Sequence, residues 1–149
     1  MIFNRTLNDV ENSLKIREEK VKKGIELSQD DLDILGKGFL TVGTINRIEQ
    51  KQEELSEEFS KNGYFNSKTE NKTWNDGDFF LKTDFERILR NNDILKDSFF
   101  VFSSTPTNAT KKANYENLNK IEKMLYDLQI MIDDMKNRYR RCGTFNCGG

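Results

Sequence analysis

The stretch INRIEQKQEELSEEF, residues 45–59, reads as an amphipathic helix, and its pattern recurs twice in the 149-residue chain. The other copies are FERILRNNDILKDSF at 85–99 and LNKIEKMLYDLQIMI at 118–132. All three begin apolar-x-Arg/Lys-Ile and carry apolar residues ten and fourteen positions after the first. Amphipathic helices can resemble one another by chance, but the shared Arg/Lys-Ile step favours a repeated structural unit.

Apolar residues in each copy follow steps of three and four, which is typical of the a and d positions of a coiled coil. Helices this short are marginal alone in water, so they need sibling copies or another chain as partners. Gln52 and Asn92 fall on a/d positions, where a polar residue fixes register and oligomeric state. We therefore expect self-association. The predicted interface comprises Ile45, Ile48, Gln52, Leu55, Phe85, Ile88, Asn92, Leu95, Leu118, Ile121, Leu125, Leu128, Ile132 and Met135.

Only 35% of the residues are hydrophobic and 33% are charged, which favours narrow helical seams over a thick core. We expect a mainly α fold of short helices with heptad-like a/d seams, a long, coiled-coil-like C-terminal helix and a few short extended segments. The extended segments are predicted near Trp74 and in SFFVFSS at 98–104. The predicted divisions are an N-terminal helical segment at 1–38, two lead-in/helix units at 39–103, and a linker, long helix and Gly/Cys tail at 104–149.

Helix boundaries are predicted from capping residues and glycines. The first helix is expected over 7–23. The predicted N-caps are Thr6, Ser28 with Asp31 in a capping box, Thr44, and either Thr83 or Asp84. The predicted helix stops are Gly24, Gly36 with Gly38, Gly63 and Gly143.

The composition argues against several function classes. The absence of histidine excludes imidazole bases and histidine metal ligands. A net charge of −1 with interspersed signs gives no broad surface for nucleic acid, and the arginines of RYRR at 138–141 read as complements to a helix dipole. No apolar run is long enough to span a bilayer. Carboxylate runs such as DDLD at 30–33 read as solvated helix faces. We expect no enzyme activity, no cofactor and no membrane partner.

The C-terminal stretch RRCGTFNCGG contains both cysteines, Cys142 and Cys147. Half of a metal site, completed by a second chain, is one interpretation, but no further cysteine or histidine is available. A disulfide is another. A pair of reduced thiols is favoured over both. The nearby glycines let the backbone approach another surface, and Phe145 offers an apolar anchor. We therefore predict a docking tail that carries Cys142, Phe145 and Cys147.

The stretch WNDGDFFLKTDFERILRNNDIL, residues 74–95, resembles a turn-plus-helix element of tail, baseplate and fibre-associated structural proteins of bacteriophages that infect Gram-positive bacteria. The matching residues are Trp74, Gly77, Asp78, Asp84, Phe85, Arg87, Ile88 and Asn92. NRIE at 46–49 and NKIE at 119–122 are similar to the helix half alone. The earlier copy lacks the Trp and Gly-Asp, and the later copy has a different lead-in. The resemblance implies a virion structural part, with trimers the commonest oligomer.

We therefore expect a structural assembly component of a bacteriophage virion, in the tail, baseplate or fibre-attachment apparatus. It would be assembled in the bacterial cytoplasm and would bind copies of itself and other virion structural proteins. The alternative is a cytosolic coiled-coil adaptor or small inhibitor protein of a low-GC bacterium or phage. A small catalytic or metal module centred on the two cysteines is a third class.

Overall fold

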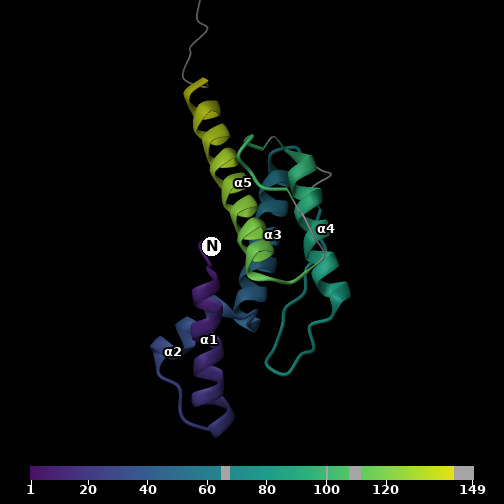
Figure 1. Cartoon of the computed structure of the whole chain (residues 1–149). Helices are drawn as coiled ribbons and strands as arrows, with labels where there is room; N and C mark the ends of the chain where they lie inside the picture. Colours follow the sequence, from purple (N-terminus) through teal and green to yellow (C-terminus); the bar gives the residue numbers. More distant parts are fainter. Residues whose placement is uncertain (65–67, 100, 108–111, 143–149) are drawn as a thin grey trace, which may run out of the picture.

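The computed structural model describes residues 1–64, 68–99, 101–107 and 112–142, with side chains up to residue 138 (Figure 1). Five α-helices and one short 3₁₀ helix account for most of this part of the chain. They are α1 (Leu7–Glu19), η1 (Val21–Lys23), α2 (Gln29–Gly38), α3 (Val42–Lys61), α4 (Lys82–Ser98) and α5 (Tyr115–Cys142). The predicted mainly α class with a long C-terminal helix is confirmed.

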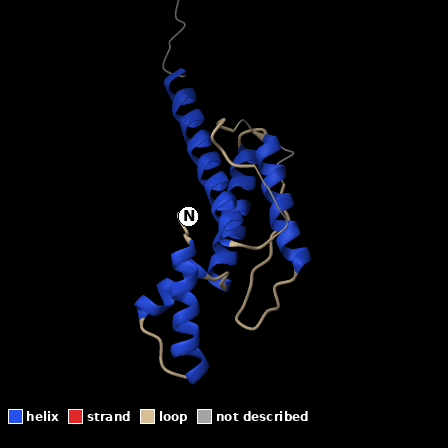
Figure 2. Cartoon of the chain, in the orientation of Figure 1, coloured by secondary structure: helices blue, strands red, loops and turns tan. Residues whose placement is uncertain are grey.

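No described residue lies in a β-strand (Figure 2). The strands predicted near Trp74 and in 98–104 are therefore wrong for the residues described there: Ser98 ends α4, and Trp74 lies in a loop. The segment around Trp74 is extended but lies against helices. Its backbone bonds to helix side chains, and not to a neighbouring strand. Local β propensity was overridden by this tertiary packing.

Helices α3, α4 and α5 form a three-helix bundle in which all three run in the same direction (Figure 1). Between α3 and α4, residue 49 contacts 87, 52 contacts 92 and 59 contacts 99. Between α3 and α5, residue 47 contacts 122 and 58 contacts 129. Partner numbers rise together in both pairs, which is the signature of parallel helices.

Parallel neighbours require connections that travel the length of the bundle. A 20-residue helix such as α3 is about 30 Å long, a distance that roughly ten extended residues can cover. Connections 62–81 and 99–114 are long enough for this return. Parallel helix dipoles are complemented by Asp84 in the first turn of α4 and by Lys61 and Lys96 in the last turns of α3 and α4.

The three repeated stretches supply the bundle core at matching positions. Residues at the first, fourth, eighth and eleventh positions of each repeat are buried, with exposed fractions from 0 to 4%. At the fifteenth position, Phe59 and Ile132 are buried, and Phe99 is half-buried and stacks on Phe59 with ring centroids 5.3 Å apart. The three repeats of one chain therefore contribute matching residues to successive layers of a shared hydrophobic core.

One layer of this core is polar. Gln52 Nε2 donates to Asn92 Oδ1 at 2.6 Å and to the Ile88 carbonyl at 2.9 Å, while Gln52 Oε1 accepts from Asn91 Nδ2 at 3.1 Å. Leu125 occupies the equivalent position on α5. Gln52 and Asn92 were predicted to specify association between chains. They instead bond to each other and specify the register of α3 against α4.

The N-terminal hairpin of α1 and α2 projects from one end of the bundle (Figure 1). The two helices touch closely where Gly38 passes α1: a Cβ at Gly38 would overlap Ser13 Oγ and the Asp9 carbonyl oxygen. Ser13 Oγ donates to the Asp9 carbonyl at 2.9 Å and to the Ile34 carbonyl at 2.7 Å. Ion pairs Lys37–Asp9 and Lys20–Asp31 close the hairpin at 3.1 and 2.5 Å.

Several predicted helix boundaries are confirmed. Thr6 caps α1, and the Ser28–Asp31 capping box begins α2. Gly63, with φ 92°, ends α3 in a Schellman arrangement: Tyr64 N–H bonds to the Phe59 carbonyl and Gly63 N–H to that of Ser60. Gly24, with φ 65°, ends the 3₁₀ helix η1 and not the first α-helix, for which it was predicted.

Other boundaries are corrected. The first helix ends at Glu19, and α2 continues through Gly36 to Gly38. Thr41, not Thr44, caps α3, because the Thr44 hydroxyl is buried and directed at the Gly36 carbonyl. Leu81 precedes α4, and Asp84 sits one turn inside, accepting the Leu81 N–H at 2.9 Å. Gly143 lies outside the described residues.

Candidate functional site

The groove between α3 and α4 holds an extended stretch of the connection, residues 69–74. Asn46, on α3, clamps both backbone groups of Trp74: its Nδ2 donates to the Trp74 carbonyl at 2.9 Å and its Oδ1 accepts the Trp74 N–H at 2.8 Å. Asn91, on α4, clamps Glu70 in the same way, at 2.8 and 3.1 Å. The side-chain amides of Asn46 and Asn91 thereby provide hydrogen bonds to the backbone of a segment that has no neighbouring strand.

Glu49, one turn after Asn46, is the charged centre of this groove and is only 2% exposed. Arg87 donates to both of its carboxylate oxygens at 2.6 Å. Trp74 Nε1 adds a bond of 2.8 Å and the Lys72 N–H one of 2.7 Å. Hydrogen bonding to the Glu49 carboxylate raises the pKa of Arg87 above its usual value. Such bidentate, charge-assisted bonding is what makes a buried ion pair tolerable.

A second clamp of the same design lies between α5 and α3. Asn119 bonds to the N–H of Arg5 at 3.1 Å and to its carbonyl at 2.9 Å. Glu122, fully buried, accepts from Arg47 Nη2 at 2.7 Å, from Arg5 Nη1 at 3.1 Å and from the Ile2 N–H at 2.5 Å. The N-terminal residues 2–5 therefore fill this groove as residues 70–74 fill the other.

The two clamps share the motif Asn-x-Ile-Glu, at 46–49 and 119–122. In each, the Asn side chain bonds to both backbone groups of one extended residue, the Ile enters the core and the Glu accepts hydrogen bonds from an arginine of another repeat. α4 has Glu86 and Leu89 at the corresponding places, so it lacks the motif. Sequence reasoning noticed both copies but assigned them only to helix formation. Their repetition was the signal for this second role.

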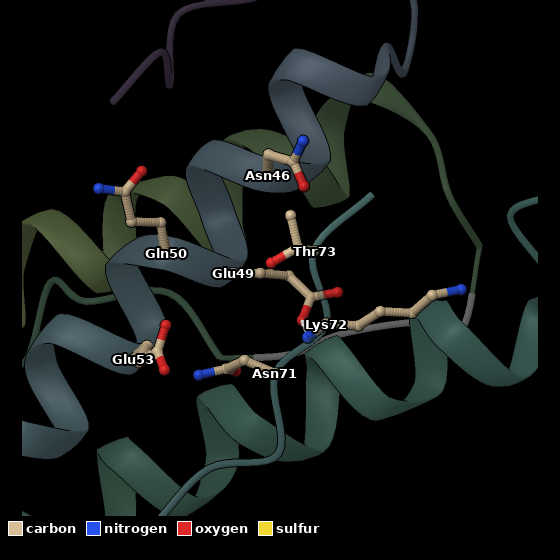
Figure 3. Close-up of a pocket in the computed structure, with 7 residues that line it drawn as sticks. All are labelled: Asn46, Glu49, Gln50, Glu53, Asn71, Lys72 and Thr73. Atoms are coloured by element: carbon tan, nitrogen blue, oxygen red, sulfur yellow. Dashed lines mark hydrogen bonds between the residues drawn. The ribbon is translucent and has the colours of Figure 1, made fainter. Parts of the chain in front are cut away.

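An open cavity of about 530 Å³ lies beside the first clamp (Figure 3). One helix, α3, supplies one wall and the loop from 71 to 73 supplies the other. The lining residues are Asn46, Glu49, Gln50, Glu53, Asn71, Lys72 and Thr73. Lys72 Nζ lies 3.7 Å from the centroid of the Trp74 ring, which favours a cation–π contact.

The carboxylates at these sites are engaged in structural bonds. Both Glu49 oxygens receive two donors each, and Glu122 is bonded on both oxygens as well. A general base needs a lone pair directed at substrate, which these bonds occupy. Within the described residues, no group of three or more His, Cys, Asp and Glu side chains could hold a metal ion. Among the described helices, none combines the length and the hydrophobicity that a membrane-spanning helix requires.

The predicted self-association residues all lie in the core of the single chain, so that prediction is corrected for these side chains. The buried members are Ile45, Ile48, Gln52, Leu55, Phe85, Ile88, Asn92, Leu95, Leu118, Ile121, Leu125, Leu128 and Ile132. Met135 is half-buried against them and accepts a hydrogen bond from the Tyr64 hydroxyl at 3.4 Å. Helices of one chain meet at a far higher effective concentration than helices of separate chains, so the three repeats pack against one another before they pack against a second chain.

The residues that carry the resemblance to phage proteins have structural roles here. Trp74 is 2% exposed, and Gly77 adopts φ 96° in the following turn. Asp78 Oδ2 accepts the Asn75 N–H at 2.9 Å within that turn. Phe85, Ile88 and Asn92 enter the core, while Asp84 and Arg87 make the cap and the clamp described above. The element is thus a turn, a helix start and one clamp partner.

The α1–α2 hairpin exposes a set of large apolar side chains that the sequence analysis did not single out. Residues of the α1–α2 hairpin expose large apolar side chains by 37 to 58%, and no apolar residue of α1 or α2 is buried. The exposed ones are Leu7, Leu14, Val21, Ile25, Leu32 and Ile34.

The predicted docking tail lies outside the described side chains. Phe145 and Cys147 lie outside the described residues, and Cys142 is the last residue of α5, beyond the described side chains.

No protein-family model, no curated protein and no solved structure matches this chain.

Proposed function

We propose that the protein is a structural assembly component of a bacteriophage virion, in the tail, baseplate or fibre-attachment apparatus, and that it acts by binding other protein subunits and not by catalysis. The observation that carries the binding role is the apolar surface of the α1–α2 hairpin. Six of its Leu, Ile and Val side chains are exposed: four lie on α1 and α2, which bury no apolar residue, and Val21 and Ile25 lie in the connection between them. Exposed apolar patches of this kind mark protein interaction sites.

The bundle supports this role as a rigid base. Its core is complete within one chain, and two Asn-x-Ile-Glu clamps fix the segments that lead into the hairpin and into α4. The binding hairpin is thus joined to an element whose position is well determined. The bonded state of Glu49 and Glu122 supports a structural use for the most buried carboxylates. The virion assignment is supported by the resemblance of residues 74–95 to phage tail elements.

The test is the presence of the protein in purified phage particles. Particles produced with the wild-type chain should contain it at fixed stoichiometry by quantitative mass spectrometry, and gold-labelled antibody should mark one end of the tail. A variant with Leu7, Leu14 and Leu32 changed to Ser should fold but be lost from the particles. The matched control changes Phe102, an exposed apolar residue remote in sequence from the hairpin, to Ser.

Two outcomes would count against the proposal. If the protein is absent from particles while the hairpin still binds a cytosolic protein, the chain is an adaptor or inhibitor. If the hairpin variant is incorporated as well as the wild type, another surface makes the contact.

A further inference from the structure

The two extended segments described above occupy their grooves to different lengths. Trp74 and Lys72, in the α3–α4 groove, bond to the Asn and the Glu of one motif, as Arg5 and Ile2 do in the α5–α3 groove. Both segments therefore run along their grooves in the same direction. The first segment extends three residues further, to Thr69, whose N–H also bonds to a helix side chain. The α5–α3 groove has the same positions beyond its N-terminal segment.

Beyond Met1, the α5–α3 groove is open. Two cavities, of about 390 and 420 Å³, follow one another along α3 and α5, which lie side by side (Figure 1). Both cavities have Lys51, Glu54 and Gln129 in their walls. Among the described residues, these walls are formed by α3 with its C-cap, by α5 and by Met1. This open part of the α5–α3 groove thus has room for a chain segment where the α3–α4 groove holds residues 69 and 70.

One wall residue of the open part has a hydrogen-bond donor to spare. Arg47 and Arg87 are both third in their repeats and both bond to a buried glutamate, but Arg87 Nη1 also donates to the Glu70 carbonyl at 2.7 Å. Arg47 bonds through Nε and Nη2, and its Nη1 has no acceptor among the described residues. The Arg47 side chain is 34% exposed, against 15% for Arg87. Arg47 can therefore bind a carbonyl of a segment in the open part.

Two further wall residues correspond to Ser56 and Asn91, which bond to the backbone of residues 69 and 70. Gln129, twelfth in its repeat like Ser56, donates through its amide nitrogen to two helix carboxylates at 3.2 and 3.0 Å. Its amide oxygen remains to accept a backbone N–H. Lys51, seventh in its repeat like Asn91, has an ammonium group in place of an amide, and an ammonium group can only donate. The open part therefore keeps the means to bind an extended backbone and adds a positive charge.

We propose that the open part of the α5–α3 groove is a docking site for an extended polypeptide segment of another subunit, with a carboxylate side chain opposite Arg47 and Lys51. An extended segment is what the corresponding positions of the α3–α4 groove hold. In such docking, main-chain hydrogen bonds supply affinity and alternate side chains supply specificity. The inference rests on the assembly role proposed above in that the segment comes from another subunit, and it adds a second docking surface to the hairpin.

Charges at this level of the groove favour an acidic side chain in the docked segment. Three cations, Arg5, Arg47 and Lys51, lie with two carboxylates, Glu54 and Glu122, which leaves an excess of one positive charge. The corresponding position of the α3–α4 groove also holds a glutamate. A lysine or arginine of the segment would be repelled there.

Peptide binding in solution is the first test. The probe is acetyl-Lys-Thr-Glu-Asn-amide, which has the sequence of residues 68–71, and the readout is the NMR spectrum of the isotope-labelled full chain. The probe should give saturable shifts in the resonances of Arg47, Lys51 and Gln129. A second peptide, with lysine in place of the glutamate, should bind at least about tenfold more weakly, because its ammonium group meets two cations.

Substitutions in the wall show whether the peptide binds in this groove. Lys51→Glu should reverse the preference, so that the lysine peptide binds more tightly than the glutamate peptide. Gln129→Leu should weaken both peptides alike, because it removes an acceptor for a backbone N–H. The matched control is Lys82→Glu, at an exposed lysine of α4 outside this groove, which should keep the wild-type preference. Circular dichroism checks that all three variants keep their helices.

Attaching the same four residues directly before Met1 provides a second measurement, because the tether holds them at the groove at a millimolar effective concentration. The amide of the attached glutamate should exchange with solvent at least about tenfold more slowly than in the same tethered chain carrying Lys51→Glu. Equal exchange in these two proteins would overturn the inference, as would an unchanged peptide preference in Lys51→Glu. None of these measurements involves phage particles or the hairpin, so the inference and the assembly role fail separately.

Discussion

Arg87 of the second repeat holds Glu49 of the first repeat through two bonds of 2.6 Å, one to each carboxylate oxygen. Arg47 of the first repeat holds Glu122 of the third in a related way, through its Nε and Nη2 at 3.2 and 2.7 Å. Each Arg-Ile step thus donates its arginine to the glutamate of another repeat. These pairs join repeats that are adjacent in space, and the same glutamates bond to the extended segments that precede α1 and α4.

Removing Glu49 should be strongly destabilising. Glu49→Ala removes the carboxylate that pairs with Arg87 and accepts hydrogen bonds from Trp74 Nε1 and the Lys72 N–H. Breaking a buried ion pair in this way lowers the free energy of unfolding by about 3–5 kcal/mol. Urea unfolding followed by the emission of Trp74, the only tryptophan, would measure it. Glu53→Ala, one turn away and exposed, should change stability by less than about 0.5 kcal/mol. Equal effects of the two substitutions would contradict the clamp.

The polar layer of the core should behave as a coupled pair. Gln52→Leu alone strands Asn92, whose Nδ2 is buried and unpaired, and should cost about 1–3 kcal/mol. The double variant Gln52→Leu/Asn92→Leu completes an apolar layer with Leu125 and should be at least as stable as the wild type. Thermal unfolding of the two single variants and the double variant gives the coupling energy. Additive losses would show that the two side chains act independently.

Gly38 and Gly36 provide a matched test of the hairpin. Gly38→Ala would drive a Cβ into Ser13 and the Asp9 carbonyl, so α1 and α2 must separate. Gly36→Ala meets no atom within 4 Å and should stabilise α2 by up to about 1 kcal/mol through helix propensity. Hydrogen exchange of α1 and α2 amides should accelerate in the first variant and slow in the second, with the bundle unchanged. Similar exchange in both variants would contradict the close crossing.

Acid should loosen the hairpin through Asp31. The Lys20 ammonium, followed by Ser28 backbone and side-chain bonds, lowers the pKa of Asp31 from 3.8 to about 2. A carboxyl whose folded pKa is depressed stabilises the fold above its unfolded pKa, and this contribution is lost as pH falls through the folded value. Wild-type hairpin stability should therefore decline between about pH 4 and pH 2.

The Asp31→Asn variant should lack this part of the decline. Asp9, whose pKa is lowered by Thr6 and Lys37, titrates in the same direction in both proteins, so the difference between them isolates Asp31. The measurement is the pH dependence of hairpin amide exchange and of the Asp31 carboxyl resonance. Parallel pH curves for the two proteins would contradict the assignment.

The sequence by itself determined the helices and their buried faces. The 3-4 spacing predicted which side chains of α3, α4 and α5 enter a core, and Thr6, Ser28 and Gly63 predicted helix ends, because capping and periodicity depend on residues one turn apart. The repeat was visible for the same reason. Asn46 and Glu49, and Asn119 and Glu122, were visible only as parts of helices.

Only the tertiary structure decided which surfaces cover those faces. An a/d pattern is equally well satisfied by sibling helices or by other chains, and the periodicity does not distinguish them. Connections long enough to return along the bundle let α3, α4 and α5 pack in parallel within one chain, so Gln52 found Asn92 of the same molecule. The hairpin, held close by Gly38 and Ser13, was left with its apolar side chains outside. Which surface covers an apolar helix face depends on the path of the chain over many residues, and a local sequence pattern contains no information about that path.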